Sequence, residues 1–85
     1  MDQDLKLRLT VRNREQVLIN EEVKSISSYN DRGVFDVLPE HTNFISLIHK
    51  FIAIRRLSGE TIQIRLENGI MRVFKEKIDV FLGLK

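Results

Sequence analysis

The chain has 85 residues and a mass of 10.0 kDa, which suffices for one domain and leaves no room for a second core. Hydrophobic residues make up 42% and charged residues 31%, a balance typical of soluble globular domains rather than disordered chains. The net charge is only +2, so no strong positive field is expected, and the absence of cysteine excludes disulfides and thiolate sites. We expect a single domain over residues 1–85.

The amino-terminal half is predicted to form short strands. Leu5–Val11 alternates apolar and polar side chains, which predicts a half-buried strand. Val17–Ile19 and Val23–Tyr29 predict two more strands, with a break at Asn20–Glu22. Asn30–Gly33 has the composition of a tight turn, because Asn and Asp bond their own backbone and Gly tolerates positive φ.

The rest of the chain continues this pattern. A short strand is predicted at Val34–Leu38, and Pro39 ends it because proline lacks a backbone donor. Hairpin turns are predicted at Ser58–Gly59 and Asn68–Gly69, the latter pair suiting a type I′ turn. Five apolar segments predict the remaining strands: Phe44–Leu47, Phe51–Leu57, Thr61–Leu66, Ile70–Phe74 and Ile78–Leu82.

About nine short strands without a helix predict an all-β fold, an antiparallel β-sandwich or flattened barrel. The expected core is drawn from apolar positions along these strands: Leu7, Leu9, Ile26, Ile54, Ile62, Ile64, Val73, Ile78 and Val80.

Enzymatic constellations are not found in the sequence. His41 and His49 form no metal-binding pair at helical spacing, and no glycine-rich phosphate loop can be drawn. Ser25, Ser27 and Ser28 lack a nucleophile elbow and are expected to face solvent from a strand. Asp31 is expected in a turn and Asp36 on a strand face. We therefore expect no catalytic residue, no metal site and no cofactor.

A binding module remains. A small β-barrel with basic strand faces could hold nucleic acid, but single-strand binders also need exposed aromatics for base stacking. Of the aromatic residues, only Tyr29 and Phe81 are expected to be exposed, which favours a solvated face over a nucleic-acid site. A nucleic-acid or protein binding module is kept as the alternative function, with five candidate phosphate contacts: Lys6, Arg8, Arg55, Arg65 and Arg72.

One segment resembles a known family. Asp31–His41, DRGVFDVLPEH, resembles the acidic residue, Gly, short strand and Leu-Pro-Gly-His of the epsilon subunit of F-type ATP synthases. Leu5–Leu9 and Glu22–Ile26 are similar to that family's first strand and its Glu-Val-x-x-Val strand. Asn68–Val73 and Lys77–Leu82 are similar to its Gly-Gly-x-x-x-Val and Asn-x-Val-x-Ile-Leu close. The resemblance covers nearly the whole chain, from Leu5 to Leu82.

The chain departs from the family pattern in three ways. Glu40 replaces the Gly of Leu-Pro-Gly-His, and Asn68 replaces the first Gly of the pair. The Pro39–Phe44 loop resembles the epsilon subunit of the alternate, sodium-translocating form of the synthase. Family members usually continue into a C-terminal helical hairpin, whereas only Gly83–Lys85 follow the last strand here. We therefore expect the hairpin, with its nucleotide-binding and inhibitory roles, to be lacking.

The resemblance implies a β-sandwich of about ten strands that acts as a non-catalytic rotor subunit in the central stalk. Such a subunit links the gamma subunit to the membrane c-ring and supports coupling of hydrogen-ion or sodium-ion transport to ATP synthesis or hydrolysis. It binds no cofactor and no nucleic acid, and it sits peripherally at the cytoplasmic face of the inner (plasma) membrane, which it contacts only through the complex. The first five residues, Met1–Leu5, are acidic and lack a signal peptide's order, which agrees with a cytoplasmic location.

By position, the resemblance also implies the partner-binding residues. Toward the c-ring loops it implies Gly33, Val34 and Phe35, and toward gamma it implies His41, Thr42 and Ser46. The residues themselves leave alternatives open. Phe35 is either an exposed apolar anchor beside Val34 or an inward-facing side chain. His41 is either a loop residue bonded to nearby backbone or an interface contact sensitive to pH.

Overall fold

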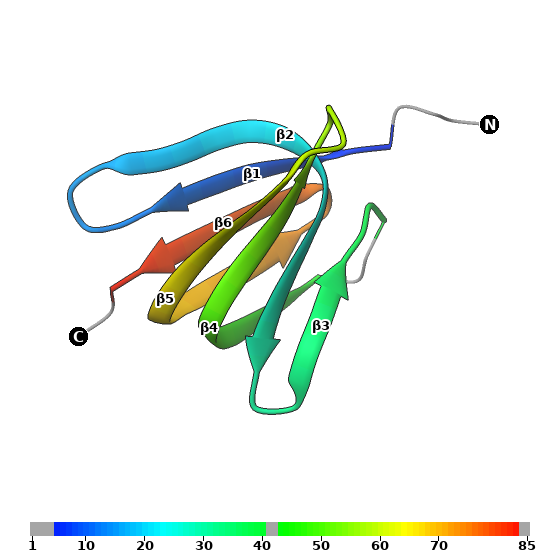
Figure 1. Ribbon diagram of the computed structural model, residues 1–85. Helices are drawn as coiled ribbons and strands as arrows, with labels where there is room; N and C mark the ends of the chain where they lie inside the picture. The colour runs from blue at the N-terminus through cyan, green and yellow to red at the C-terminus, as the bar shows by residue number, and fades with distance from the viewer. Residues whose placement is uncertain (1–4, 41–42, 84–85) are drawn as a thin grey trace.

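The computed structural model describes residues 5–40 and 43–83, and every regular element in these two ranges is a β-strand. Within them, no helix is long and apolar enough to span a membrane. An all-β fold is therefore confirmed, but with fewer strands than the nine read from the sequence or the ten implied by the resemblance. The strands are β1 (Leu7–Arg12), β2 (Val17–Asn30), β3 (Gly33–Val37), β4 (Phe44–Arg56), β5 (Thr61–Phe74) and β6 (Lys77–Leu82) (Figure 1).

The count differs because three strands are long and bent. β2, β4 and β5 have 14, 13 and 14 residues, and each was read from the sequence as two short strands. The polar residues Asn20–Glu22 do not interrupt β2, since all three pair with β1. The break predicted at Asn20–Glu22 is therefore wrong, because these polar residues lie in an exposed part of a continuous strand.

The hairpin turn predicted at Asn68–Gly69 is wrong for a related reason. Gly69 lies inside β5, paired with Ile48 of β4 on one side and Leu82 of β6 on the other. A Cβ at this position would lie 2.7 Å from the carbonyl oxygen of Phe81. Glycine is needed here because the backbone of β6 approaches closely, and not because a turn requires positive φ. The turn predicted at Ser58–Gly59 is confirmed, and Gly59 has a φ of 100°.

The strands close into a ring. Their order is β1-β6-β5-β4-β2, and β2 returns to pair with β1, while β3 extends the sheet beyond β2. The predicted antiparallel arrangement holds for the pairings between described strands except that of β1 with β6, which is parallel. Closure removes most unpaired edges, which otherwise expose strands to aggregation.

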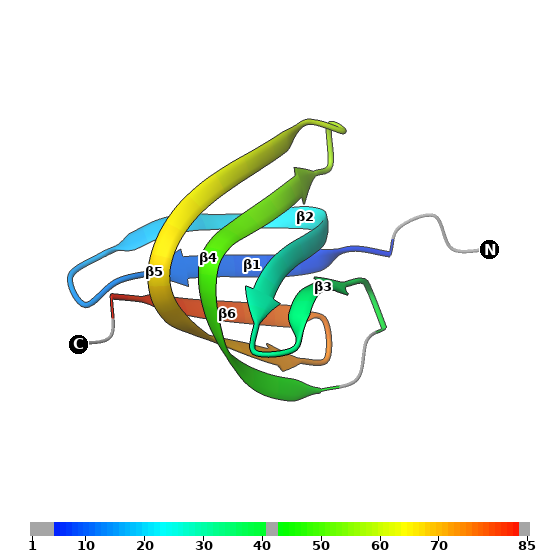
Figure 2. The same cartoon turned by 60° about the horizontal axis from the view of Figure 1, so that its bottom comes forward.

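The ring is flattened into two layers. The first layer holds β1, β6, the early parts of β2 and β4 and the late part of β5. The second holds β3, the late parts of β2 and β4 and the early part of β5. Figure 2 shows β4 and β5 as long arcs that pass together from one layer to the other. The bend of β4 contains a bulge between Ile48 and Lys50, where Lys50 has a φ of 78°. Bulges sharpen strand curvature, so this one helps turn the strand between layers.

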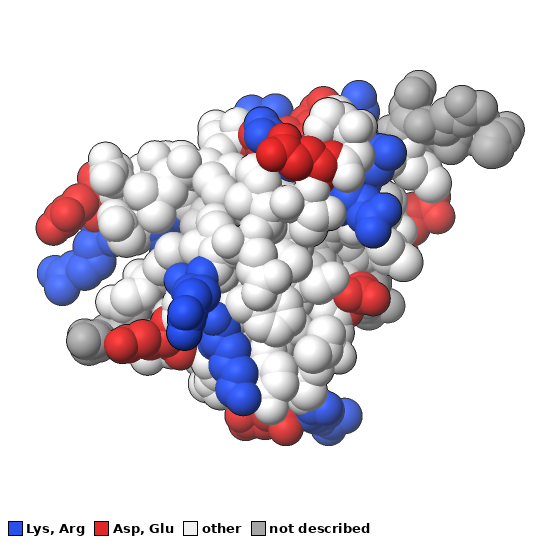
Figure 3. Space-filling model, viewed as in Figure 1, with Lys and Arg blue, Asp and Glu red and all other residues white. Residues whose placement is uncertain are grey.

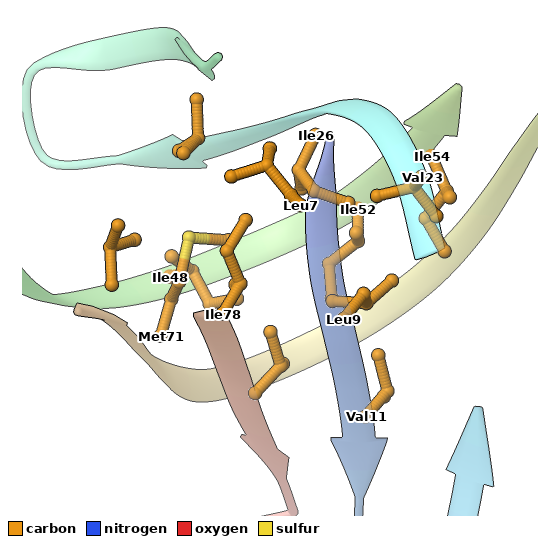
Figure 4. Close-up of a cluster of buried hydrophobic side chains, with 13 residues drawn as sticks. Leu7, Leu9, Val11, Val23, Ile26, Ile48, Ile52, Ile54, Met71 and Ile78 are labelled. Atoms are coloured by element: carbon orange, nitrogen blue, oxygen red, sulfur yellow. The ribbon is translucent and has the colours of Figure 1, made fainter. Parts of the chain in front are cut away.

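Between the layers lies one hydrophobic core (Figure 4). Seven of the nine predicted core residues are fully buried or nearly so: Leu7, Leu9, Ile26, Ile54, Val73, Ile78 and Val80. The prediction is wrong for Ile62 and Ile64, which are only half-buried. The early part of β5 pairs with β4 alone, so it forms an edge of the second layer and leaves these side chains partly open. The other buried hydrophobic residues are Val11, Val23, Val37, Ile48, Ile52 and Met71.

One serine was also placed wrongly. Ser28 is fully buried, and its Oγ donates a hydrogen bond of 2.8 Å to the carbonyl oxygen of Phe51. A register shift between Val23 and Ser25 changes the alternation of β2, so Ile26 and Ser28 point inward. Ser25 and Ser27 are half-buried and line a surface groove on the second layer.

Candidate partner-binding surface

The β2–β3 hairpin carries three of the residues implied to contact a partner. Its tip is the predicted turn: the side-chain oxygen of Asn30 accepts a hydrogen bond of 2.9 Å from the backbone amide of Arg32. Gly33 has a φ of 112°, a conformation that residues with a Cβ rarely adopt. Local hydrogen bonding and glycine therefore fix the shape of the tip, and Asp31 is a turn residue as expected.

Val34 and Phe35 have different surroundings. Val34 is 66% exposed, whereas Phe35 is half-buried and packs against the core. The ring of Phe35 meets that of Phe44 edge-on, with centroids 6.0 Å apart. Such aromatic pairs add stability beyond the area they bury. Of the two alternatives for Phe35, the structure shows the inward one, which leaves Val34 as the exposed apolar side chain of the tip.

The hairpin is tied to β4 by polar contacts. The Asn30 side-chain amide donates a hydrogen bond of 3.1 Å to the hydroxyl oxygen of Ser46. Across the same junction, Nε2 of His49 lies 3.6 Å from the Asp31 carboxylate, and the His49 ring lies 5.8 Å from that of Tyr29. Ser46, predicted as a partner contact, thus also joins the hairpin to its neighbour. These contacts limit the freedom of the hairpin to bend away from β4.

Beside Ser46, the first layer exposes apolar side chains that were not predicted from the sequence to contact a partner. Ile45 is 70% exposed and Leu47 is 67% exposed, one on each side of Ser46 along β4. Leu47 pairs with Ile70 of β5, which pairs with Phe81 of β6, itself 43% exposed. We call the surface formed by Ile45, Leu47, Ile70 and Phe81 the apolar face. Contiguous exposed apolar side chains are typical of interaction sites.

One signal in the sequence of Phe44–Ile48 could have indicated this surface. The sequence predicted a strand at Phe44–Leu47 from its apolar residues, without indicating which side chains face outward. Only the strand pairing shows that Ile45 and Leu47 point outward while Ile48 points into the core. The polar Ser46 between Ile45 and Leu47 was the available sign of alternation.

His41 and Thr42 lie outside the described residues, so their implied roles stay predictions. On either side of them, Glu40 has a φ of 68°, and the Asn43 side-chain oxygen accepts a hydrogen bond of 2.6 Å from the amide of Lys75. The described partner-binding residues come together in part. Ser46 contacts the tip of the hairpin through Asn30, and Val34 lies exposed one residue pair further from the turn.

Most basic residues proposed as phosphate contacts already have partners. Nζ of Lys6 lies 3.4 Å from a Glu22 carboxylate oxygen, Arg8 donates to Asn20, and Arg72 pairs with Asp79 at 3.0 Å. Arg55 and Arg65 make no side-chain hydrogen bond or ion pair with another described residue. Because Lys6, Arg8 and Arg72 already contact other side chains, they are less available to bind phosphates.

The aromatic residues give no flat stacking platform. Tyr29 is half-buried, and Nζ of Lys50 lies 4.2 Å from its ring centroid, so the expectation of an exposed Tyr29 is wrong. Phe81 is exposed as expected, and Phe74, expected within an apolar stretch, is 51% exposed. Phe74 turns outward because the strand alternation after Val73 places it on the outer side of β5.

Among residues 5–40 and 43–83, no group of three or more His, Asp or Glu residues could hold a metal ion. The described residues form a small closed sandwich with a hairpin braced on β4 and an exposed apolar face, a kind of surface that marks interaction sites.

Comparison with known proteins makes this class specific. Residues 6–82 match the family model of the ATP synthase delta/epsilon chain, beta-sandwich domain. The chain belongs to this family. It is 26% identical over 72 residues to the ATP synthase epsilon chain of Sulfurovum sp. (strain NBC37-1), an alignment that covers 84% of this chain and 56% of that protein. The chain therefore spans little more than half the length of this relative.

Solved structures share the fold. A chain of the Euglena gracilis mitochondrial ATP synthase superposes with a TM-score of 0.86 at 18% identity, covering 96% of this chain and 53% of that one. A chain from the central stalk and c-ring of the Tetrahymena thermophila mitochondrial ATP synthase has a TM-score of 0.75 at 12% identity, covering 91% and 63%. The β-sandwich implied by the resemblance is confirmed by this likeness.

Proposed function

We propose that this chain is the β-sandwich portion of a non-catalytic rotor subunit of an F-type ATP synthase. It fastens the gamma subunit to the polar loops of the c-ring and so supports coupling of ion transport to ATP synthesis or hydrolysis. The observation that carries the proposal is the family match over residues 6–82, which includes both layers and the β2–β3 hairpin.

The structure suits a mechanical role. The strands form a closed ring around one core. Deforming this ring would break backbone hydrogen bonds between several strands at once, so the domain should be stiff. The hairpin tip presents Val34 and is braced on β4 by Asn30 and Ser46. An apolar side chain on a rigid support is an effective interface anchor, since little conformational entropy is lost when it docks.

Partners and location follow from the same proposal. Val34 at the hairpin tip contacts the c-ring loops, and Ser46 with the loop containing His41 and Thr42 contacts gamma. The protein is then peripheral to the membrane, at its cytoplasmic face, and contacts the membrane only through the complex. The alternate, sodium-translocating form remains a prediction from the Pro39–Phe44 loop alone, because the matched relative is named only as an ATP synthase epsilon chain.

Substitution at the hairpin tip tests the proposal. Val34→Asp places a charge on an exposed tip and should weaken co-assembly with gamma and c-ring by about tenfold or more while leaving the thermal unfolding curve unchanged. Val17→Asp is the matched control, because Val17 is also exposed but lies in the β1–β2 hairpin, away from β3 (Figure 1). Assembly is measured by co-purification of the reconstituted rotor. Equal loss with both variants, or none with Val34→Asp, would overturn the c-ring assignment of the hairpin.

A further inference from the structure

The outer side of the second layer contains a groove that the proposed rotor contacts do not use. It has a volume of about 390 Å³ and draws residues from four strands and the loop after β3. Ser25, Ser27 and Ala53 form its floor, because their side chains are shorter than those of the other residues that line it. Four larger residues and a threonine form its walls and ends: Lys24, Asp36, Leu38, Arg55 and Thr61.

The charges of the groove are arranged unevenly. Lys24 and Arg55 make no side-chain hydrogen bond or ion pair with another described residue, and neither do the hydroxyls of Ser25 and Thr61. Ser25 pairs with Arg55, and Arg55 pairs with Thr61, so these groups form one row across three strands. This end of the groove, which we call the basic end, thus offers free cations beside free hydroxyls.

The other end is acidic and already engaged. Asp36 faces Ser27 across the β2–β3 pairing, and the Ser27 hydroxyl donates a hydrogen bond to its carboxylate. A bound carboxylate is repelled there and attracted to the basic end. Figure 3, viewed like Figure 1, shows a largely uncharged centre, with Lys and Arg side chains at the upper right and over β4 and β5 at the lower left.

We propose that the groove binds an acidic peptide segment of a partner protein, with a Glu or Asp side chain at Lys24 and Arg55. The positive charges of Lys24 and Arg55 favour an anion, and the guanidinium of Arg55 can donate two parallel hydrogen bonds to a carboxylate. The free hydroxyls of Ser25 and Thr61 supply further donors. The uncharged floor and the carboxylate of Asp36 suit an extended peptide that carries a backbone or amide donor next to its acidic residue.

A peptide fits better than a nucleic acid. Binding a single strand requires aromatic side chains for its bases, and no described Phe or Tyr lines the groove. Asp36 would also lie close to any following phosphate. The groove is on the opposite layer from the apolar face, so both surfaces can be occupied in one complex.

The test is an NMR titration of the isotope-labelled 85-residue chain with a short polyglutamate peptide, with polyglutamine of the same length as the uncharged probe. Saturable shifts confined to the amides of Ser25, Ser27, Ala53 and their neighbours are expected with polyglutamate only. The double variant Lys24→Gln with Arg55→Gln should lower the affinity about fivefold or more, since two exposed ion pairs are lost.

The matched control is Arg14→Gln with Lys77→Gln. It removes the same net charge from two residues outside the groove that likewise make no side-chain hydrogen bond or ion pair with another described residue. It should change the affinity less than about twofold. Asp36→Asn should strengthen the binding of polyglutamate, because in this probe a second glutamate lies next to the bound one and is repelled by the Asp36 carboxylate.

Three results would overturn the proposal. Equal weakening by both double variants would show diffuse charge attraction, and shifts spread over both layers would show that the groove is not the site. Tighter binding of an oligodeoxythymidylate at the same amides would assign the groove to nucleic acid. Because the probes involve no ATP synthase subunit, failure here leaves the rotor assignment unaffected.

Discussion

The outer surfaces of the two layers differ in chemistry although they cover the same core. The first layer exposes Ile45, Leu47 and Phe81, and its arginine at position 72 is paired with Asp79. The second exposes small polar side chains around a groove whose cations, Lys24 and Arg55, form no ion pair with residues 5–40 or 43–83. Paired charges around apolar residues favour a protein interface without trapped water, whereas charges without a partner in a polar groove favour electrostatic recognition.

Both surfaces depend on the same bent strands. β4 presents Ile45 and Leu47 on the first layer and Ala53 and Arg55 on the second, and the bend lies between them. A change at the bend should therefore alter both surfaces, while a change on one outer surface should alter only that one. Substitutions can separate these two behaviours.

The largest effect is expected at the bend of β4. Ile48 is fully buried and pairs with Gly69, so Ile48→Ala leaves a cavity where the layers join. The free energy of unfolding should fall by about 2–5 kcal/mol, as measured by urea denaturation. A loss below about 1 kcal/mol would mean that the bend collapses readily and is not a fixed joint.

The facing position on β5 should be nearly as sensitive. Gly69→Ala brings a Cβ to within 2.7 Å of the Phe81 carbonyl oxygen, so β6 must move. We expect a loss of about 1–3 kcal/mol in unfolding free energy. Gly59→Ala serves as the comparison for steric contact. A Cβ at Gly59 would meet no atom within 4 Å, so only the positive φ of this residue opposes the substitution. If Gly69→Ala were neutral, close backbone approach would not explain the glycine.

A substitution on the apolar face should act on binding alone. Leu47 lies next to Ser46, the proposed gamma contact, so we propose that the apolar face also contacts gamma. Leu47→Glu puts a charge in the middle of that surface and should weaken the affinity for gamma by about tenfold, measured by calorimetry. Gln63→Glu adds the same charge to an exposed position of the second layer and serves as control. If Leu47→Glu and Gln63→Glu bound gamma with equal affinity, the apolar face would not be the surface that binds gamma.

The smallest effect is expected for the ion pairs at the end of the second layer. Arg56 donates two hydrogen bonds to Glu21, at 3.0 and 3.1 Å, and lies 3.5 Å from Glu60. Its side chain is partly exposed, so Arg56→Gln should cost about 0.5–1 kcal/mol and less at high salt. Thermal unfolding at low and high salt measures this, and a cost that does not depend on salt would point to lost packing instead of lost charge.

Short, regular features of the fold could be predicted from the sequence. β1 alternates strictly, and the Asn30–Gly33 turn follows from side-chain hydrogen bonding and glycine, so both were predicted correctly. Seven core residues were also predicted, because each has a polar neighbour on at least one side along its strand. These features depend on local chemistry that neighbouring residues already contain.

The long bent strands could not be predicted in the same way. Gly69 and the bulge before Lys50 owe their conformations to neighbouring strands, and Asn68–Gly69 in isolation favours a hairpin turn. The candidate site was predicted only in part for the same reason. The family pattern indicated Val34 and Ser46, but the outward orientation of Ile45 and Leu47 appears only after strand pairing. The same is true of the groove with Lys24 and Arg55 at its basic end.

The measurement that tests the rotor assignment most directly is calorimetric titration of this chain against the isolated gamma subunit of the same synthase. It is run at two salt concentrations, with a single-stranded oligonucleotide as the parallel titrant. The assignment predicts saturable one-to-one binding to gamma and no binding to the oligonucleotide. Absence of binding to gamma, together with salt-sensitive binding to the oligonucleotide, would contradict it and leave a family fold that serves nucleic-acid binding.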